Sequence, residues 1–195
     1  MPTALQEWKA KVAAQVKVVA TLQAKLAAAQ KTLAALRAAK PKPAPTLVER
    51  LMPIVRKELG TAEWPAGSNR GPIVKYLASV GLSGGYPWCA AFVTWCLHKA
   101  DYKGPWPPNR AYCPSWEVML RKNGLVKAKV NARRGDIVLF DWQGDGVSDH
   151  IGFITASYGP IKVIHTIEGN TGDKGAVLRR VRPWWQVRIV ARLHD

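Results

Sequence analysis

The first forty residues carry a sustained seven-residue repeat of apolar side chains that stops at a cluster of prolines. The repeat has two series, and each member of the second follows a member of the first by three positions. The first series is Leu5, Val12, Val19, Leu26 and Leu33, and the second is Trp8, Gln15, Leu22, Ala29 and Leu36. Gln15 is the one polar interruption, and the segment has no internal Gly or Pro. The spacing therefore predicts a single helix over residues 4–40 with a coiled-coil seam.

This helix is also strongly basic. Residues 4–40 hold seven Lys or Arg against the single acidic residue Glu7. Self-association through residues 4–40 is the interpretation that we favour. Lysines beside the seam (Lys9, Lys11 and Lys25) would repel each other in a parallel dimer, so the assembly should be weak or sensitive to salt. A solitary amphipathic helix, a helix that packs on another protein, or a basic helix on an anionic membrane surface also fits the pattern.

The prolines that follow divide the chain. The run Pro41-Lys42-Pro43-Ala44-Pro45 ends the helix and should form a stiff spacer over residues 41–45. Residues 46–195 are numerous enough to bury a sizeable core, so we expect one domain there. Thr46 and Glu49 have the spacing of a capping box at its first helix, and Pro53 should kink or restart that helix.

Within residues 46–195, helical patterns precede strand patterns. Short helices are expected at about 46–60, 73–80, 89–98 and 115–123. From Gly135 the pattern changes to alternating residues, and strands are expected at 136–140, 150–156, 161–168, 176–181 and 187–192. Helices first and strands afterwards, joined by loops of hairpin length, predict an α+β domain with an antiparallel sheet.

Cys89 is the candidate nucleophile. Residues 84–87 contain two glycines and a proline that end the preceding structure, and an apolar helix begins at the cysteine. A thiol at a helix start meets unpaired backbone N–H groups and the positive end of the helix dipole, which both favour the thiolate. Cys96 lies two turns further along the same apolar face and is expected to be a core residue. Cys113 is either free or paired with Cys96, and the sequence leaves this open.

His150 is the histidine best placed to act as the base. His98 is nine residues along the same helix as the cysteine, about 13 Å away by helical rise. His165 precedes Glu168 by three residues on a strand, so their side chains face opposite sides of the sheet. The fourth histidine lies at the C-terminus. Gly152 shares a strand face with His150, and its lack of a side chain should let the nucleophile helix or a substrate approach.

Polar groups on the next strand could orient the imidazole. Glu168 and Asn170 are two residues apart, so they should share a face and accept from the second N–H of His150. An ordinary turn at the strand end is the alternative interpretation of the same residues. Trp88, next to the nucleophile, and Trp142, in the loop before His150, are the candidates for lining a substrate cleft.

The charge of the whole chain indicates anionic partners. The formal net charge is +16 and the pI is about 10.1, which predicts attraction to nucleic acid, anionic lipid or anionic wall polymers. The basic residues follow no recognised nucleic-acid-binding module, so nucleic acid is the least expected of these.

Cysteine usage and hydropathy exclude other classes. Three cysteines, an odd number, exclude a pure disulfide framework. No Cys-x-x-Cys or His-Glu-x-x-His occurs, so we expect no metal and no cofactor. Lysines interrupt every apolar stretch near the N-terminus, and no run reaches the roughly 18 apolar residues of a membrane span. The sequence therefore predicts neither a signal peptide nor a transmembrane segment, and synthesis in a reducing cytoplasm.

Four motifs in order resemble those of the CHAP family, the cysteine, histidine-dependent amidohydrolases/peptidases. The resemblance runs from Leu47 to the C-terminus. Its motifs are Tyr86-Pro87-Trp88-Cys89-Ala90-Ala91-Phe92-Val93, Arg134-Gly135-Asp136-Ile137-Val138-Leu139-Phe140, Asp149-His150-Ile151-Gly152 and Glu168-Gly169-Asn170-Thr171. The loop at residues 67–71 is also similar to the loop that precedes the nucleophile in a bacterial and phage branch of the family.

The resemblance implies a papain-like fold that cleaves bacterial peptidoglycan, between glycan and peptide stem or within the peptides. It implies Cys89 as nucleophile, His150 as base, and Glu168 with Asn170 as orienting groups. Some members bind calcium in an Asp-rich loop before the nucleophile, but residues 81–85 contain no carboxylate. We expect a phage lysin or virion-associated lysin, made in the host bacterial cytoplasm and acting at the wall. The alternative is a non-catalytic, wall-binding structural protein of the virion.

Overall fold

The computed structural model describes residues 1–39 and 44–194, which fall into two compact units. The first unit is Met1–Ala44 and the second is Pro45–Asp195. The expected spacer at residues 41–45 lies largely outside the described residues, as does Lys40 at the end of the expected helix. Each unit is therefore described by itself.

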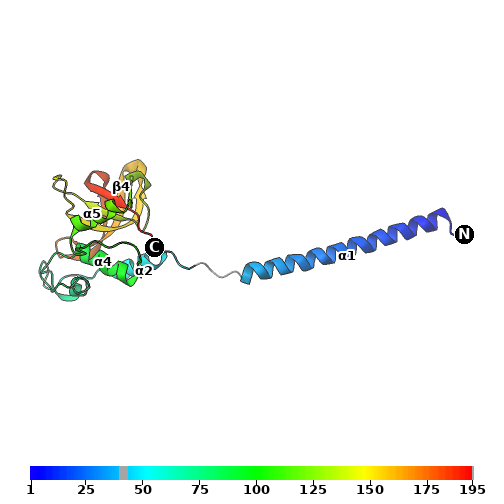
Figure 1. Ribbon diagram of the computed structural model, residues 1–195, viewed down its shortest axis with the longest axis horizontal. Coiled ribbons are helices and arrows are strands. Elements are labelled where there is room, and N and C mark those ends of the chain that lie inside the picture. The colour runs from blue at the N-terminus through cyan, green and yellow to red at the C-terminus, as the bar shows by residue number, and fades with distance from the viewer. Residues whose placement is uncertain (40–43, 195) are drawn as a thin grey trace. The chain divides into compact units, whose positions relative to one another are not determined.

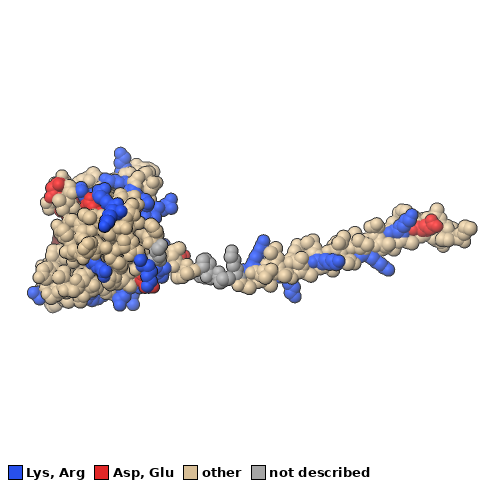
Figure 2. Space-filling view, in the orientation of Figure 1, with Lys and Arg blue, Asp and Glu red and all other residues tan. Residues whose placement is uncertain are grey.

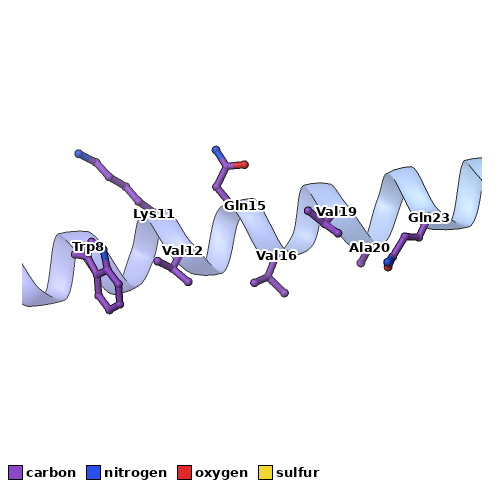
Figure 3. Close-up of a pocket in the computed structure, with 8 residues that line it drawn as sticks. All are labelled: Trp8, Lys11, Val12, Gln15, Val16, Val19, Ala20 and Gln23. Carbon is purple, nitrogen blue, oxygen red and sulfur yellow. The ribbon is translucent and has the colours of Figure 1, made fainter.

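The first unit is the helix α1, Ala4–Ala39, which is continuous (Figure 1). No side chain within it is buried. Figure 3 shows Trp8, Val12 and Val16 projecting to one side of α1, while Lys11 and Gln15 project to the other. Val16 lies outside the predicted seven-residue series and is 63% exposed, so the apolar surface of α1 is wider than the expected seam. Self-association through α1 stays a prediction.

The second unit begins with a capped helix, α2, Leu47–Lys57. The capping box is present, because the backbone N–H of Thr46 donates to Glu49 Oε2 at 2.8 Å and the backbone N–H of Glu49 donates to Thr46 Oγ1. α2 continues through Pro53, so the expected restart at that proline is wrong. Four side chains at helical spacing anchor α2 in the core: Leu47, Leu51, Met52 and Val55.

The remaining elements follow the expected order of helices and then strands. Three more helices are α3, Val74–Ala78, α4, Cys89–Lys99, and α5, Cys113–Lys122. The strands are β1, Val126–Lys127; β2, Ile137–Phe140; β3, His150–Tyr158; β4, Val163–Thr171; β5, Ala176–Pro183; and β6, Val187–Ala191. In the described residues the sheet has the order β1-β6-β2-β3-β4-β5, and every pair is antiparallel. The predicted α+β class with an antiparallel sheet is confirmed, and the short strand β1 is an addition to it.

The two faces of the sheet bury two different cores. Side chains such as Ile151, Phe153 and Ile167 face α4 and the other helices. Their neighbours in the strands, including Ile154 and Ile164, form a smaller core on the opposite face. This alternation is the period-2 pattern of a strand that is covered on both sides.

Helix α4 packs closely against β3 and β4. Eight of its eleven residues are buried, as expected for a helix that is apolar around most of its circumference. Gly169 in β4 allows the close approach, because a Cβ there would lie 2.7 Å from Phe92 Cβ and from the Trp88 ring. The packing brings the N-terminus of α4, where Cys89 lies, to the sheet next to the start of β3.

Candidate active site

Cys89 is the first residue of α4 and is 7% exposed. The Cys113 thiol, whose Sγ lies 3.6 Å from Cys89 Sγ, lowers the pKa of Cys89 well below its ordinary value. The charge and hydrogen bond of His150 and the backbone N–H of Ala90 act in the same direction, and burial opposes them. The helix begins at the cysteine, as expected, and the function of Cys89 as nucleophile stays a prediction.

His150 and Glu168 are in direct contact across the sheet. His150 Nε2 lies 3.1 Å from Glu168 Oε2, and both side chains are buried. Because Nε2 is engaged by the carboxylate, Nδ1 is the ring nitrogen left to face Cys89. Gly152 leaves the space that this contact needs, since a Cβ there would lie 2.7 Å from Glu168 Cγ. The expected function of Gly152 is thus corrected, because the Glu168 side chain fills the space beside it.

Glu168 is held by more partners than the histidine alone. Thr166 Oγ1 donates to Glu168 Oε1 at 2.6 Å, and Arg182 donates from Nε to Oε1 at 3.0 Å and from Nη2 to Oε2 at 2.6 Å. Burial alone would raise the pKa of Glu168, but the hydrogen bonds from His150 and Arg182 lower it to about 2. The carboxylate is therefore ionised and fixed in orientation, as a partner for an imidazolium requires.

The His150 ring lies against Trp142. The two rings are stacked with their centroids 4.9 Å apart, and the loop that carries Trp142 is tied back by the bond from its backbone N–H to Asp149 Oδ2 at 2.6 Å. Burial would lower the pKa of His150, but the Cys89 thiolate and Glu168 raise it to about 9. Cys89 and His150 are thus arranged as a thiolate–imidazolium pair.

Asn170 was expected to lie on the same strand face as Glu168, but its side chain lies toward Trp88 and Glu63. With its amide oxygen toward α4, it accepts from the Trp88 backbone N–H at 3.0 Å and donates to Glu63 Oε1 at 3.2 Å. The strand register shifts between Glu168 and Thr171, and Asn170 has a φ of 54°. This bulge breaks the alternation of side chains, so the expectation that Asn170 shares a face with Glu168 is wrong. Asn170 instead fixes the peptide that precedes the nucleophile.

Trp88 is part of the core. Its side chain is fully buried, stacks on Tyr76 at 5.3 Å and donates its indole N–H to Glu63 Oε1 at 2.8 Å. The expectation that the Trp88 side chain lines a substrate cleft is therefore wrong, because a residue at this point must anchor α4 before the cysteine. Trp142, by contrast, is 44% exposed and borders a pocket.

The other cysteines and histidines have surroundings different from those of Cys89 and His150. Cys96 is fully buried, and burial raises the pKa of its thiol well above the ordinary value. Cys113 contacts Cys89 instead of Cys96, and all three cysteines are free thiols. His165 packs beside Tyr158 with ring centroids 5.0 Å apart, and His98 contacts Arg110.

Two pockets border this cluster. One, of about 410 Å³, is lined by Trp142, Asn170, Thr171, Gly172, Asp173, Arg180, Arg182, Trp185 and Gln186. The other, of about 370 Å³, is lined by Val80, Leu82, Tyr86, Pro87, Asn109, Ala111 and Tyr112, and so includes the residue before Cys113 and the residue two positions before Cys89. A concavity along α1 belongs to that helix alone (Figure 3).

Sequence reasoning missed two contributors to the site. Arg182 could have been suspected from its spacing, since Arg180 and Arg182 are two apart on a strand and share a face. Nothing in the sequence places that face against Glu168. Glu63 lies in a loop far from the motifs, and only the fold brings it to Trp88 and Asn170.

The cluster lies within a segment that matches a known protein family. Residues 81–170 match the family model of the CHAP domain. The CHAP match contains Cys89, His150, Glu168 and Asn170. With this match, the helices followed by an antiparallel sheet are the α+β, papain-like arrangement expected of a CHAP domain.

Two solved structures match part of this chain. One is described as similar to a lipoprotein of the NLP/P60 family from Staphylococcus aureus, with 13% identity, a TM-score of 0.43, and coverage of 80% of this chain and 45% of the other. The second is an NLPC/P60 family protein from Bacillus cereus, with 16% identity, a TM-score of 0.47, and coverage of 80% and 42%. This chain thus spans less than half the length of either structure. No curated protein matches the sequence.

Within residues 1–39 and 44–194, no three His, Cys, Asp or Glu side chains gather into a group that could hold a metal ion. Independence from metals stays a prediction. Across the same residues, no helix has both the length and the apolar character needed to cross a bilayer.

The hydrogen bonds that Glu168 accepts predict how the stability of the protein depends on pH. The pKa of Glu168 is about 2 in the folded protein against an ordinary 4.5, so its stabilisation is complete above pH 4.5 and is lost as the pH falls toward 2. Glu168→Gln should therefore reduce the free energy of unfolding most at pH values above 4.5. Denaturant unfolding of both proteins across this range should show the difference shrinking as the pH falls. A difference in the free energy of unfolding that stays constant with pH would contradict an ionised, hydrogen-bonded Glu168.

Proposed function

We propose that the chain is a cysteine-dependent peptidoglycan hydrolase. The observation that carries the proposal is the cluster of Cys89, His150 and Glu168, in which a helix-start thiol with a lowered pKa faces an imidazole held by a buried, ionised carboxylate. These are the nucleophile, base and orienting group of acyl-transfer catalysis. The CHAP match over these residues supports the substrate class.

The mechanism begins from the thiolate–imidazolium pair. Cys89 Sγ attacks an amide carbonyl of the wall polymer, and the carbonyl oxygen gains negative charge. Backbone N–H groups at the start of α4 are the nearest donors for this oxyanion. His150 then donates its Nδ1 proton to the departing amine, which leaves an acyl thioester on Cys89. A water molecule, deprotonated by His150, attacks the thioester and releases the carboxylate product with the thiol restored.

Glu168 and Arg182 serve this cycle through His150. The imidazole changes charge twice in each turnover, and the carboxylate keeps one tautomer and one ring orientation through both changes. Arg182 keeps the carboxylate ionised and in place through its two hydrogen bonds to it. Trp142, stacked on the same imidazole, restricts its movement from the solvent side.

The proposed bond is an amide, either between the glycan and the peptide stem or within the peptides. Both are amides that this cluster can cleave, and the pocket lined by Trp142, Asn170 and Arg182 offers room for part of a substrate next to the site. Figure 2 shows Lys and Arg side chains on both units of the chain, in keeping with the net charge of +16. This charge favours association with anionic wall polymers.

At the finer level we propose a phage lysin or a virion-associated lysin. The support is the resemblance of the loop at residues 67–71 to a bacterial and phage branch. The alternative, a structural virion protein that only binds wall, predicts no bond cleavage. The full-length protein should lower the turbidity of a purified wall suspension, and Cys89→Ala should not. Wall binding by both proteins with no clearing by either would favour the structural alternative.

We propose that α1 acts in association, with itself or with anionic surfaces, and not in catalysis. A protein that starts at Thr46 should cleave soluble wall fragments at nearly the full-length rate, but bind intact walls less well at low salt. The difference in binding should shrink as salt rises, because the screening length falls from about 8 Å at physiological ionic strength to about 3 Å at 1 M. Cleavage of soluble wall fragments measures the rate, and sedimentation with intact walls measures the binding. Loss of activity on soluble fragments would place α1 in the catalytic fold.

A further inference from the structure

The contact between Cys89 and Cys113 joins two helix starts. Cys89 is the first residue of α4 and Cys113 is the first residue of α5. Their sulfur atoms are 3.6 Å apart, and the two residues are 7% and 5% exposed. Two free thiols at this distance, shielded from water, are within reach of an S–H···S hydrogen bond. The mechanism above does not use Cys113.

The charges around the pair decide which sulfur keeps its proton. Cys89 faces His150 on β3 and receives the backbone N–H of Ala90 on its own helix, and both stabilise a negative sulfur. The hydrogen bond with Cys89, burial and the negative charges of Cys89 and Asp149 all stabilise the neutral thiol of Cys113, and its own backbone N–H opposes them more weakly. These are the titratable and polar groups that act on the two sulfur atoms from β3, α4, α5 and the loop before β3. The proton therefore lies on Cys113, and Cys113 is the donor.

A buried thiolate needs such a donor. Removing a charged group from water is costly unless hydrogen bonds replace its hydration. His150 supplies one donor to Cys89, but its proton must leave during catalysis. A second donor that keeps its proton stabilises the thiolate throughout and restricts the rotation of the Cys89 side chain.

We propose that Cys113 is a positioning residue of the active site, whose thiol donates a hydrogen bond to the Cys89 thiolate and keeps it charged at acid to neutral pH. This deepens the proposed function, because it assigns a second thiol to the same site. Its test does not depend on the substrate, since the ionisation of Cys89 can be followed by alkylation alone.

The experiment measures the rate at which iodoacetamide alkylates Cys89 as a function of pH, by mass spectrometry of peptides from the full-length protein. In Cys113→Ala the midpoint of the profile should move to higher pH. At pH values below the wild-type midpoint, alkylation should slow by about tenfold or more, because hydrogen bonds to charged groups are the strong ones. The rate at high pH, where the thiol is fully ionised, should change little.

Cys113→Ser separates a hydrogen-bonding function from a packing function. Its hydroxyl is a donor of similar size, so the midpoint should stay close to the wild-type value. Equal shifts in the serine and alanine variants, or no shift in a folded alanine variant, would overturn the proposal. Cys96→Ser, a buried cysteine on the same helix, is the matched control and should leave the midpoint unchanged.

A second measurement covers the case in which Cys113→Ala does not fold. The ultraviolet absorbance of thiolate in Cys96→Ser should show a single ionisation at low pH, which belongs to Cys89, while Cys113 stays protonated to high pH. Two thiolates at neutral pH would overturn the proposal. Absence of wall hydrolysis by the unchanged protein, with the alkylation shift in Cys113→Ala intact, would count against the proposed function and leave this inference standing.

Discussion

Cys89→Ala should abolish wall hydrolysis while leaving the fold intact. Only Cys89 combines a helix start, a neighbouring imidazole and a lowered thiol pKa. The expected loss is at least about 1,000-fold, as for removal of the nucleophile of a catalytic triad. Release of soluble fragments from purified walls measures the activity, and far-ultraviolet circular dichroism measures the fold.

The control for this variant is Cys96→Ser. Cys96 is buried in the same helix, so a structural effect of changing a cysteine in α4 should appear there as well. Its activity should remain near that of the unchanged protein. If Cys89→Ala remained active, another group would have to be the nucleophile and the proposed mechanism would be wrong.

His150→Ala should be about as damaging as the loss of Cys89, whereas His165→Ala should retain activity. His150 is the only one of the two that contacts Glu168, and its removal takes away both the counter-ion of the thiolate and the proton donor to the leaving amine. His165 packs on Tyr158 away from this cluster. The same fragment-release assay, with thermal unfolding for both variants, compares them directly.

The pH dependence of wall hydrolysis further distinguishes His150 from His165 as the catalytic base. In the unchanged protein, activity should fall as the pH rises through about 9, because His150 then loses the proton that it must donate. A variant of His165 should keep this limb of the profile. An inactive His165→Ala that is well folded would mean that the assignment of the base is wrong.

Much of the fold could be predicted because its signals are local. The capping box at Thr46, the helix start at Cys89 and the alternation after Gly135 each depend on residues close together in the chain, and each predicts an element that is present. The continuation of α2 through Pro53 was harder to predict. Proline disfavours the interior of a helix, but the packing of the buried face of α2 keeps this helix continuous.

The candidate site was predictable where alternation holds and not where it fails. The contact between His150 and Glu168 agrees with strand parity, because the register shift in the β3–β4 pairing comes only after Ile154, on the far side of Gly152 from His150. The prediction for Asn170 was wrong because the bulge after Glu168 turns its side chain to the opposite face of the sheet. Arg182 and Cys113 come from β5 and α5, and their approach to the site depends on tertiary packing that spacing along the chain does not contain.

The most direct test of the account is mass spectrometry of purified peptidoglycan after digestion by the full-length protein. The account predicts soluble fragments with one new amine and one new carboxylate at a single type of amide bond, produced by the unchanged protein and absent with Cys89→Ala. The position of the new ends identifies the enzyme as an amidase or an endopeptidase. Intact peptidoglycan after prolonged digestion, or the same fragments with Cys89→Ala, would contradict a cysteine-dependent peptidoglycan hydrolase.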